Sequence, residues 1–162
     1  MHKLVIEILV ATALTLAAIL ALAPGVRASD IMVMGAFARA SAVPTAKAAT
    51  AYLTSMNHGA ASDRLLSITT DAAASAQLHR TTEENGIAKM RPAEFLDLPA
   101  GSSGELKPGG LHVMMTGLKA PLVEGASIML RLTFEKAGVV EIQVPVGAVV
   151  AGHDHVEGSS GG

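Results

Sequence analysis

A strict alternation of apolar and polar residues is the feature that most restricts the fold of this chain. In "SIMLRLTF" (127–134), Ile128, Leu130 and Leu132 fall on one side of an extended backbone, and the residues between them fall on the other. A period of two is that of a half-buried β-strand, whereas a helix requires a period of 3.6 residues. The stretch "VVEIQVPV" (139–146) follows the same rule. Both stretches predict strands that bury one face.

Further short runs, bounded by turn residues, also have the composition of strands. Pro44 interrupts the alanine-rich stretch 36–51, so a helix is not expected there. Many short strands separated by turns predict an all-β sandwich or barrel of short antiparallel strands. The additional predicted strands are 31–37, 49–57, 64–70, 76–82, 87–91, 104–108 and 111–118.

The two ends of the chain differ in composition from the middle. Residues 1–28 combine Lys3, a long apolar run and small residues around Ala28, which is the order of a secretory signal. We expect cleavage after Ala28 and a location in the periplasm. A membrane anchor is the alternative, although the apolar run is short for a span of about 20 residues. Residues 151–162 are rich in glycine and serine and are expected to form a flexible tail, which leaves 29–150 as the folded domain.

Composition argues against several classes of protein. Without the predicted signal, the 12 basic and 14 acidic residues become 10 and 13, and the net charge is −3. With no basic patch and 2% aromatic residues, a nucleic-acid partner is not expected. The chain has no cysteine, so it forms no disulfide and cannot be a blue-copper protein. It also lacks a cysteine nucleophile and a G-x-S-x-G elbow, and we do not expect an enzyme.

One histidine–methionine pair is predicted within the strand "LHVMMTGL" (111–118). Side chains alternate along a strand, so Val113 and Met115 share one face while His112 and Met114 share the other. The first face is apolar, and we expect it, with Met115, to point into the core. His112 and Met114 are expected to look outward, side by side.

A second pair, His79 and Met90, comes from the strands on either side of Asn85-Gly86. A four-residue loop would place His79 directly opposite Met90, with Cβ atoms about 4.5–5.5 Å apart. A two-residue loop shifts the register by two but keeps both side chains on one face. A three-residue loop would need a bulge to do so. Thioether sulfur suits Cu(I), and imidazole suits several metals including copper. Spacing leaves open whether the two pairs meet; ordinary packing is the alternative.

The spacing of these four residues resembles a known motif. His79, ten residues, Met90, twenty-one residues, His112, one residue and Met114 match the H-x10-M-x21-H-x-M pattern of the periplasmic copper chaperones called PCuAC. The resemblance extends over roughly residues 31–146. Its flanking sequences are "AKMRP" (88–92), "ELKPGGLHVMMTGLKAPLVEG" (105–125) and "LTFEKAGVVEIQVPV" (132–146).

The resemblance implies a cupredoxin-like or immunoglobulin-like β-sandwich that binds Cu(I) near its surface through His79, Met90, His112 and Met114. It also implies delivery of copper to the CuA site of cytochrome c oxidase, directly or with Sco-type thiol proteins, and membrane contact only through acceptor proteins. A copper buffer for resistance and a non-metal β-sandwich module of the envelope are the alternatives. Phe37 stands where family members commonly have tryptophan, and we expect this to affect packing near the first strand rather than the metal.

The remaining methionine and histidine residues are expected to have other roles. Met56 and His58 lie at a strand end before a turn, where a surface position is favoured. Met32 and Met34 are expected to pack on an edge strand. The tail contains a candidate secondary site for Cu(II), formed by His153 and His155.

Overall fold

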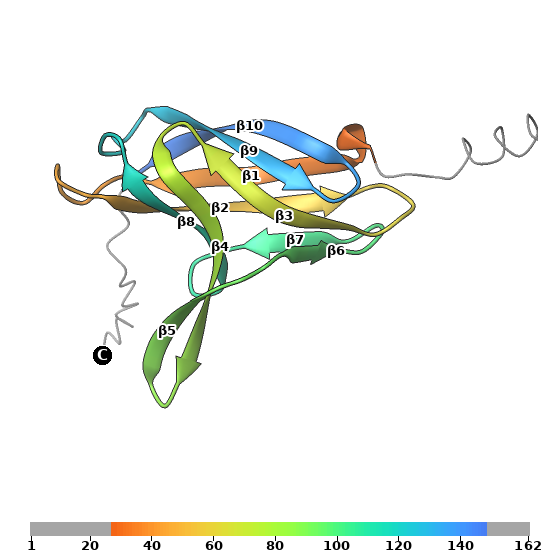
Figure 1. Ribbon diagram of the computed structural model, residues 1–162, viewed down its shortest axis with the longest axis horizontal. Coiled ribbons are helices and arrows are strands. Elements are labelled where there is room, and N and C mark those ends of the chain that lie inside the picture. Colours follow the sequence, from red (N-terminus) through yellow and green to blue (C-terminus); the bar gives the residue numbers. More distant parts are fainter. Residues whose placement is uncertain (1–26, 149–162) are drawn as a thin grey trace, which may run out of the picture.

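The computed structural model describes residues 27–148 (Figure 1). The expected cleavage site lies at its first residues, and the tail with His153 and His155 lies outside the described residues. Nothing in the described part therefore tests those two predictions. Between residues 27 and 148, no helix is both long and apolar enough to cross a membrane.

Strands dominate the described chain, and each of the nine predicted runs forms one. An additional three-residue strand, β6 (Leu96–Leu98), was not predicted, since "LDL" is too short to show a period. No helix forms in the alanine-rich stretch. In chain order the elements are η1 (Ala28–Asp30), β1 (Ile31–Arg39), β2 (Ala48–Asn57), β3 (Asp63–Thr70), β4 (Ala73–Glu84), β5 (Ile87–Pro92), β6 (Leu96–Leu98), β7 (Ser103–Leu106), β8 (Leu111–Leu118), β9 (Ser127–Phe134) and β10 (Gly138–Gly147).

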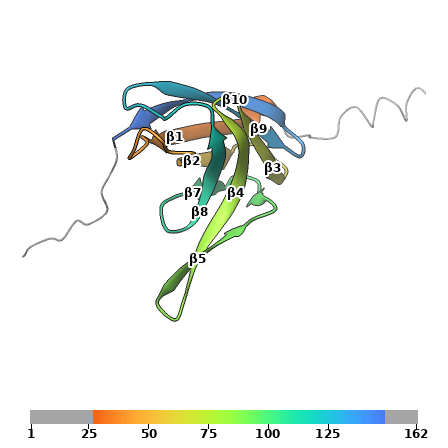
Figure 2. The ribbon, with the colours of Figure 1, turned by 60° about the vertical axis from the view of Figure 1, so that its left-hand side comes forward.

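The strands form one strongly curved sheet in the order β5-β4-β8-β2-β1-β10-β9-β3-β6, with β7 attached to β2. An additional pairing of β3 with β4, at Ile68 and Ala76, closes the sheet on itself. The result is a barrel-like sandwich, which confirms the predicted all-β class (Figure 2). One pairing departs from the antiparallel arrangement that was predicted: among the described pairings, β1 and β10 run parallel.

The core fills the interior of this closed sheet. Alternation on β9 works as predicted, because Leu130 and Leu132 are fully buried while Arg131 between them points outward. Val113 and Met115 on β8 are likewise fully buried. Full burial of such side chains contributes about 1.5–3 kcal/mol each relative to exposure. The core therefore holds β8 in a single register. The other face of β8, which carries His112 and Met114, is not needed to fill the core.

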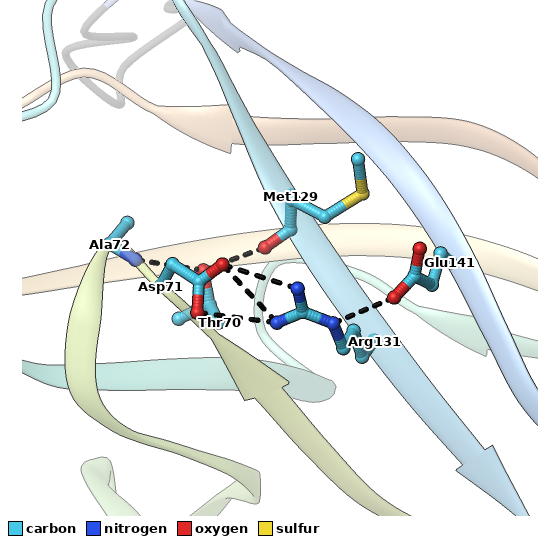
Figure 3. A network of polar contacts seen from close by, with 6 residues as sticks. All are labelled: Thr70, Asp71, Ala72, Met129, Arg131 and Glu141. Carbon is cyan, nitrogen blue, oxygen red and sulfur yellow. Dashed lines mark hydrogen bonds and ion pairs between the residues drawn. The ribbon is translucent and has the colours of Figure 1, made fainter.

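Arg131 on β9 is the centre of a polar network on the outer surface (Figure 3). Its guanidinium donates to Asp71, in the turn between β3 and β4, and to Glu141 on β10. The hydrogen bond and charge of Arg131 lower the pKa of Asp71 below its usual value. The resulting stabilisation is present at neutral pH and is lost as the pH falls through the lowered pKa. Because these groups are exposed, the network contributes little to stability.

The β4–β5 hairpin projects away from the body of the sheet in both views (Figures 1 and 2). Its base is anchored by pairing of β4 with β8, which extends from Ala73 to Arg80 on β4. Beyond Arg80 the hairpin has neighbours only within itself in the β-ladder of the described residues. A projecting hairpin exposes the side chains near its tip on both faces.

Candidate metal centre

A tight two-residue turn determines which residues face each other in the β4–β5 hairpin. Glu84 pairs with Ile87, so that the turn consists of Asn85 and Gly86, with φ angles of 55° and 76°. Two consecutive positive φ angles are typical of a type I′ turn, and asparagine followed by glycine tolerates them at little cost. The local chemistry of these two residues therefore selects the turn.

The turn gives a different register from the four-residue loop. His79 pairs with Pro92 and Met90 pairs with Thr81, so the direct opposition of His79 and Met90 is wrong. The two-residue alternative is the one observed, and it keeps both side chains on one face because the shift is by two residues. His79 and Met90 are thus diagonal neighbours across the ladder, at a Cα separation of about 7–8 Å.

The pairing of β4 with β8 brings the two histidine–methionine pairs together. His79 lies directly opposite His112, and Met114 lies opposite Gln77, two residues before His79 on β4. The ring centroids of His79 and His112 are 6.2 Å apart, and the ring planes are inclined by 28°. Opposed residues of antiparallel strands share a face. All four predicted ligands therefore lie on one face of the adjacent strands β5, β4 and β8.

His112 is held in a single orientation by its own turn. Its Nδ1 lies 3.1 Å from the carbonyl oxygen of Gly110, which can only accept, so Nδ1 carries the proton. The lone pair then resides on Nε2, which is buried and has no hydrogen-bond partner in the described structure. A backbone carbonyl that fixes the tautomer in this way is the usual outer partner of a metal-binding histidine.

His112 is less exposed than alternation suggested. It does lie on the outer face of β8, but its side chain is only 3% exposed, so the expectation of an outward-looking imidazole is wrong in this respect. The reason is its neighbours, since β8 is flanked by β2 and β4. The ring of Tyr52 on β2 lies 6.5 Å from that of His112, and the ring of His79 lies on the other side. The imidazole is thus enclosed between two rings.

His79 also has an unsatisfied ring nitrogen. Its side chain is half-buried, and Nδ1 is buried without a hydrogen-bond partner among the described residues. A buried polar atom without a partner costs about 1–3 kcal/mol, and such atoms are rare in folded proteins. Two of them on facing histidines are suited to coordinating a metal ion, which would satisfy both.

The two methionines beside the histidines differ in exposure. Met114 is half-buried on β8, whereas Met90 is 53% exposed on the projecting hairpin. The adjacent Met115 is fully buried, which confirms its predicted place in the core. In the described residues, no cluster of three or more histidine, cysteine, aspartate or glutamate side chains offers an alternative metal site. The donor set at this face is thus two imidazoles and two thioethers, without a formal charge.

A row of aromatic side chains lies beside the site and was not predicted from the sequence. Tyr52 is 6% exposed although it lies on the outer face of β2, and its ring packs 5.1 Å from the ring of Phe37. The guanidinium of Arg39 lies 5.4 Å from the Tyr52 ring. Phe37 therefore packs against the residue that covers His112. The alternation of β2 indicated the face on which Tyr52 lies, but it could not indicate that β8, with His112, is the neighbouring strand.

The other methionines singled out by the sequence lie on β1 and β2. Met32 and Met34 lie in the part of β1 that pairs only with β2, because the described pairing of β1 with β10 is confined to Ala38 and Arg39. This part of β1 is therefore an edge, as predicted, although both side chains are exposed. His58 is exposed as expected, while Met56 at the end of β2 is half-buried. Met32 faces Met56 directly across the β1–β2 ladder.

Comparisons with known proteins identify relatives of this chain. The model of a family described as LpqE-like lipoprotein matches residues 31–146. A protein of Leifsonia xyli subsp. xyli that is also named as a lipoprotein is 36% identical over 124 residues, which cover 76% of this chain and 73% of that protein.

Solved structures of PCuAC domains share the fold. The copper-bound PCuAC domain from PmoF2 has a TM-score of 0.62 at 26% identity, covering 78% of this chain and 96% of that domain. The apo PCuAC domain from PmoF1 gives 0.61 at 28% identity, with 74% and 94% covered. Cu(I)-bound DR1885 from Deinococcus radiodurans gives 0.55 at 30% identity, with 71% and 78% covered. These similarities confirm the resemblance to PCuAC domains and the predicted β fold.

Proposed function

Since this chain belongs to the LpqE-like family and folds as PCuAC domains do, we propose that it is an exported chaperone for Cu(I). One observation carries the proposal. His79 and His112 face each other with a buried, unpartnered nitrogen on each, and Met90 and Met114 lie on the same face of the sheet. Two solved relatives with this fold are described as copper-bound or Cu(I)-bound.

The donor set favours Cu(I) over other ions. Thioether sulfur is a soft ligand that stabilises Cu(I), whereas zinc sites typically use thiolate, imidazole or carboxylate. Two neutral imidazoles and two thioethers add no negative charge, which suits a monovalent ion. The chain has no cysteine, so its site cannot be lost to disulfide formation in an oxidising compartment.

The exposure of the four side chains suggests how the cargo is released. His112 is enclosed and held by Gly110, so it is the least mobile donor. Met90 is half exposed on a projecting hairpin, where an incoming ligand of an acceptor can reach it first. We therefore propose that an acceptor exchanges with Met90 first and with the enclosed His112 last. The proposed acceptor is the CuA site of cytochrome c oxidase, with Sco-type thiol proteins as partners.

The proposed location is the periplasm, reached through the N-terminal apolar segment. The family and its Leifsonia member are described as lipoproteins. These descriptions support the proposal that this chain is exported.

We expect the purified protein to hold about one Cu(I) per chain against a chromophoric chelator under anaerobic conditions. Met90→Leu and Met114→Leu should each weaken binding, because leucine keeps the size of methionine but lacks its sulfur. The matched control is Met129→Leu, which alters a half-buried methionine on β9, a strand separated from β4 by β3. Equal copper affinity in all four proteins would show that the assigned residues are not ligands.

Delivery is tested by mixing the copper-loaded protein with an apo CuA domain, with and without a reduced Sco-type protein. We expect copper in the re-isolated CuA domain, and slower or incomplete transfer when Met90 is leucine. If the protein retains its copper in both mixtures while a chelator of moderate strength removes it, the buffering alternative is favoured over delivery.

A further inference from the structure

Three methionines lie together on the outer face of β1 and β2. They are away from the proposed copper site formed by His79, Met90, His112 and Met114, which is called the four-residue site below. Met32 on β1 pairs directly with Met56 on β2, and Met34 pairs with Thr54. The β-bulge of β1 comes after Met34, so this part of the ladder is regular. Met32 and Met34 therefore share a face with Met56. Directly opposed Cβ atoms lie about 4.5–5.5 Å apart, and diagonal residues about 7–8 Å, within reach of long side chains.

The core cannot account for these side chains. Ile31 is 6% exposed and points inward, whereas Met32 and Met34 are 50% and 43% exposed. Met56 is half-buried on the same outer face. Because methionine is flexible and unbranched, three such side chains can turn their sulfur atoms toward a common point.

The surroundings of the three sulfurs do not suit a hard cation. Across β2, the residues of β7 that face Met56 and Thr54 are Ser103 and Glu105. The carboxylate of Glu105 is paired with Lys107 at 2.9 Å, which neutralises it. Hard ions such as Mg²⁺ and Ca²⁺ require several oxygen ligands. A cluster of thioethers instead selects a soft monovalent ion.

We propose that Met32, Met34 and Met56 form a second, weaker site for Cu(I). It is weaker because it offers three thioethers, two of them on exposed side chains, and no imidazole, so binding must order flexible side chains. Tyr52 and Met56 are four residues apart on β2 and therefore point to the same face of the strand, and Tyr52 lies against His112. The second site therefore opens on the same face of the sheet as the four-residue site. This site does not depend on the function proposed above.

The test uses the protein with ¹³C-labelled methionine methyl groups and Ag(I), a redox-inert soft ion, followed by NMR. Beyond the first equivalent of Ag(I), we expect the methyl signals of Met32, Met34 and Met56 to shift together. In a variant with all three replaced by leucine, bound Ag(I) should fall from about two to about one per chain. The buried Met115 and the isolated Met129 serve as internal controls.

The outcomes separate this site from the proposed function. Unchanged signals of Met32, Met34 and Met56 at excess Ag(I) overturn the second site, whatever happens at Met90 and Met114. An equal shift of Met129 would also overturn it, because any accessible thioether would then bind. Shifts of the three clustered methionines without shifts of Met90 and Met114 would support the second site and contradict the four-residue site.

Discussion

Replacing His112 by phenylalanine is expected to weaken Cu(I) binding by more than about 100-fold, since even the loss of an outer partner of a metal ligand costs about 10–100-fold. Phenylalanine keeps a planar ring between Tyr52 and His79 but removes both nitrogens. His112 is also the donor with the most fixed geometry, because Gly110 holds its tautomer. The measurement is anaerobic competition against a chelator of known affinity.

The matched control for this variant is His58→Phe, which changes an exposed histidine outside the site. Circular dichroism and thermal unfolding establish that both variants fold. We expect His58→Phe to bind Cu(I) as the unaltered protein does. If the folded His112→Phe protein kept its affinity, Nε2 of His112 would not be a ligand, and the proposed function would lose the observation that carries it.

Replacing each of the adjacent methionines of β8 by alanine should lower the stability of the protein by different amounts. Met115→Ala is expected to lower the free energy of unfolding by about 2–5 kcal/mol, because it leaves a cavity in the core. Met115 is fully buried, whereas Met114 is half-buried on the other face. Met114→Ala should lower the free energy of unfolding by only about 1 kcal/mol. Urea unfolding of the metal-free proteins measures both values.

Copper affinity should show the reverse order in the same two variants. Met114→Ala removes a proposed donor, while Met115→Ala leaves all four donors in place and should bind Cu(I) nearly as tightly wherever the protein is folded. Met115→Leu, which conserves volume, provides a stable version of the second variant. Strong loss of copper binding in Met115→Leu would mean that the faces of β8 are assigned incorrectly.

Much of the fold could be predicted because alternation is a local property of each strand. The bounds of β8 and β9 agree with the predicted stretches, and Leu130 and Leu132 are buried as their pattern indicates. The strand β6 was missed because three residues contain no period. The parallel pairing of β1 with β10 was missed because it depends on how the curved sheet closes rather than on either strand.

The sequence predicted each histidine–methionine pair of the candidate site, but it did not predict that the two pairs meet. Alternation placed His112 and Met114 on one face, and the Asn85-Gly86 turn allowed a register that keeps His79 and Met90 together. Which loop forms was left open, and the observed one shifts the register by two residues. The enclosure of His112 by Tyr52 and His79 was not foreseen, since both lie on other strands.

The sequence by itself determined which side chains of β8 and β9 share a face, because successive residues of a regular strand point in opposite directions wherever the strand lies. It separated Met114 from Met115 in this way. Tertiary structure alone decided that β4 lies beside β8 and β1 beside β2. Those neighbours follow from the closure of one sheet around a shared core, a property of the whole chain. That closure places His79 against His112 and Met32 against Met56.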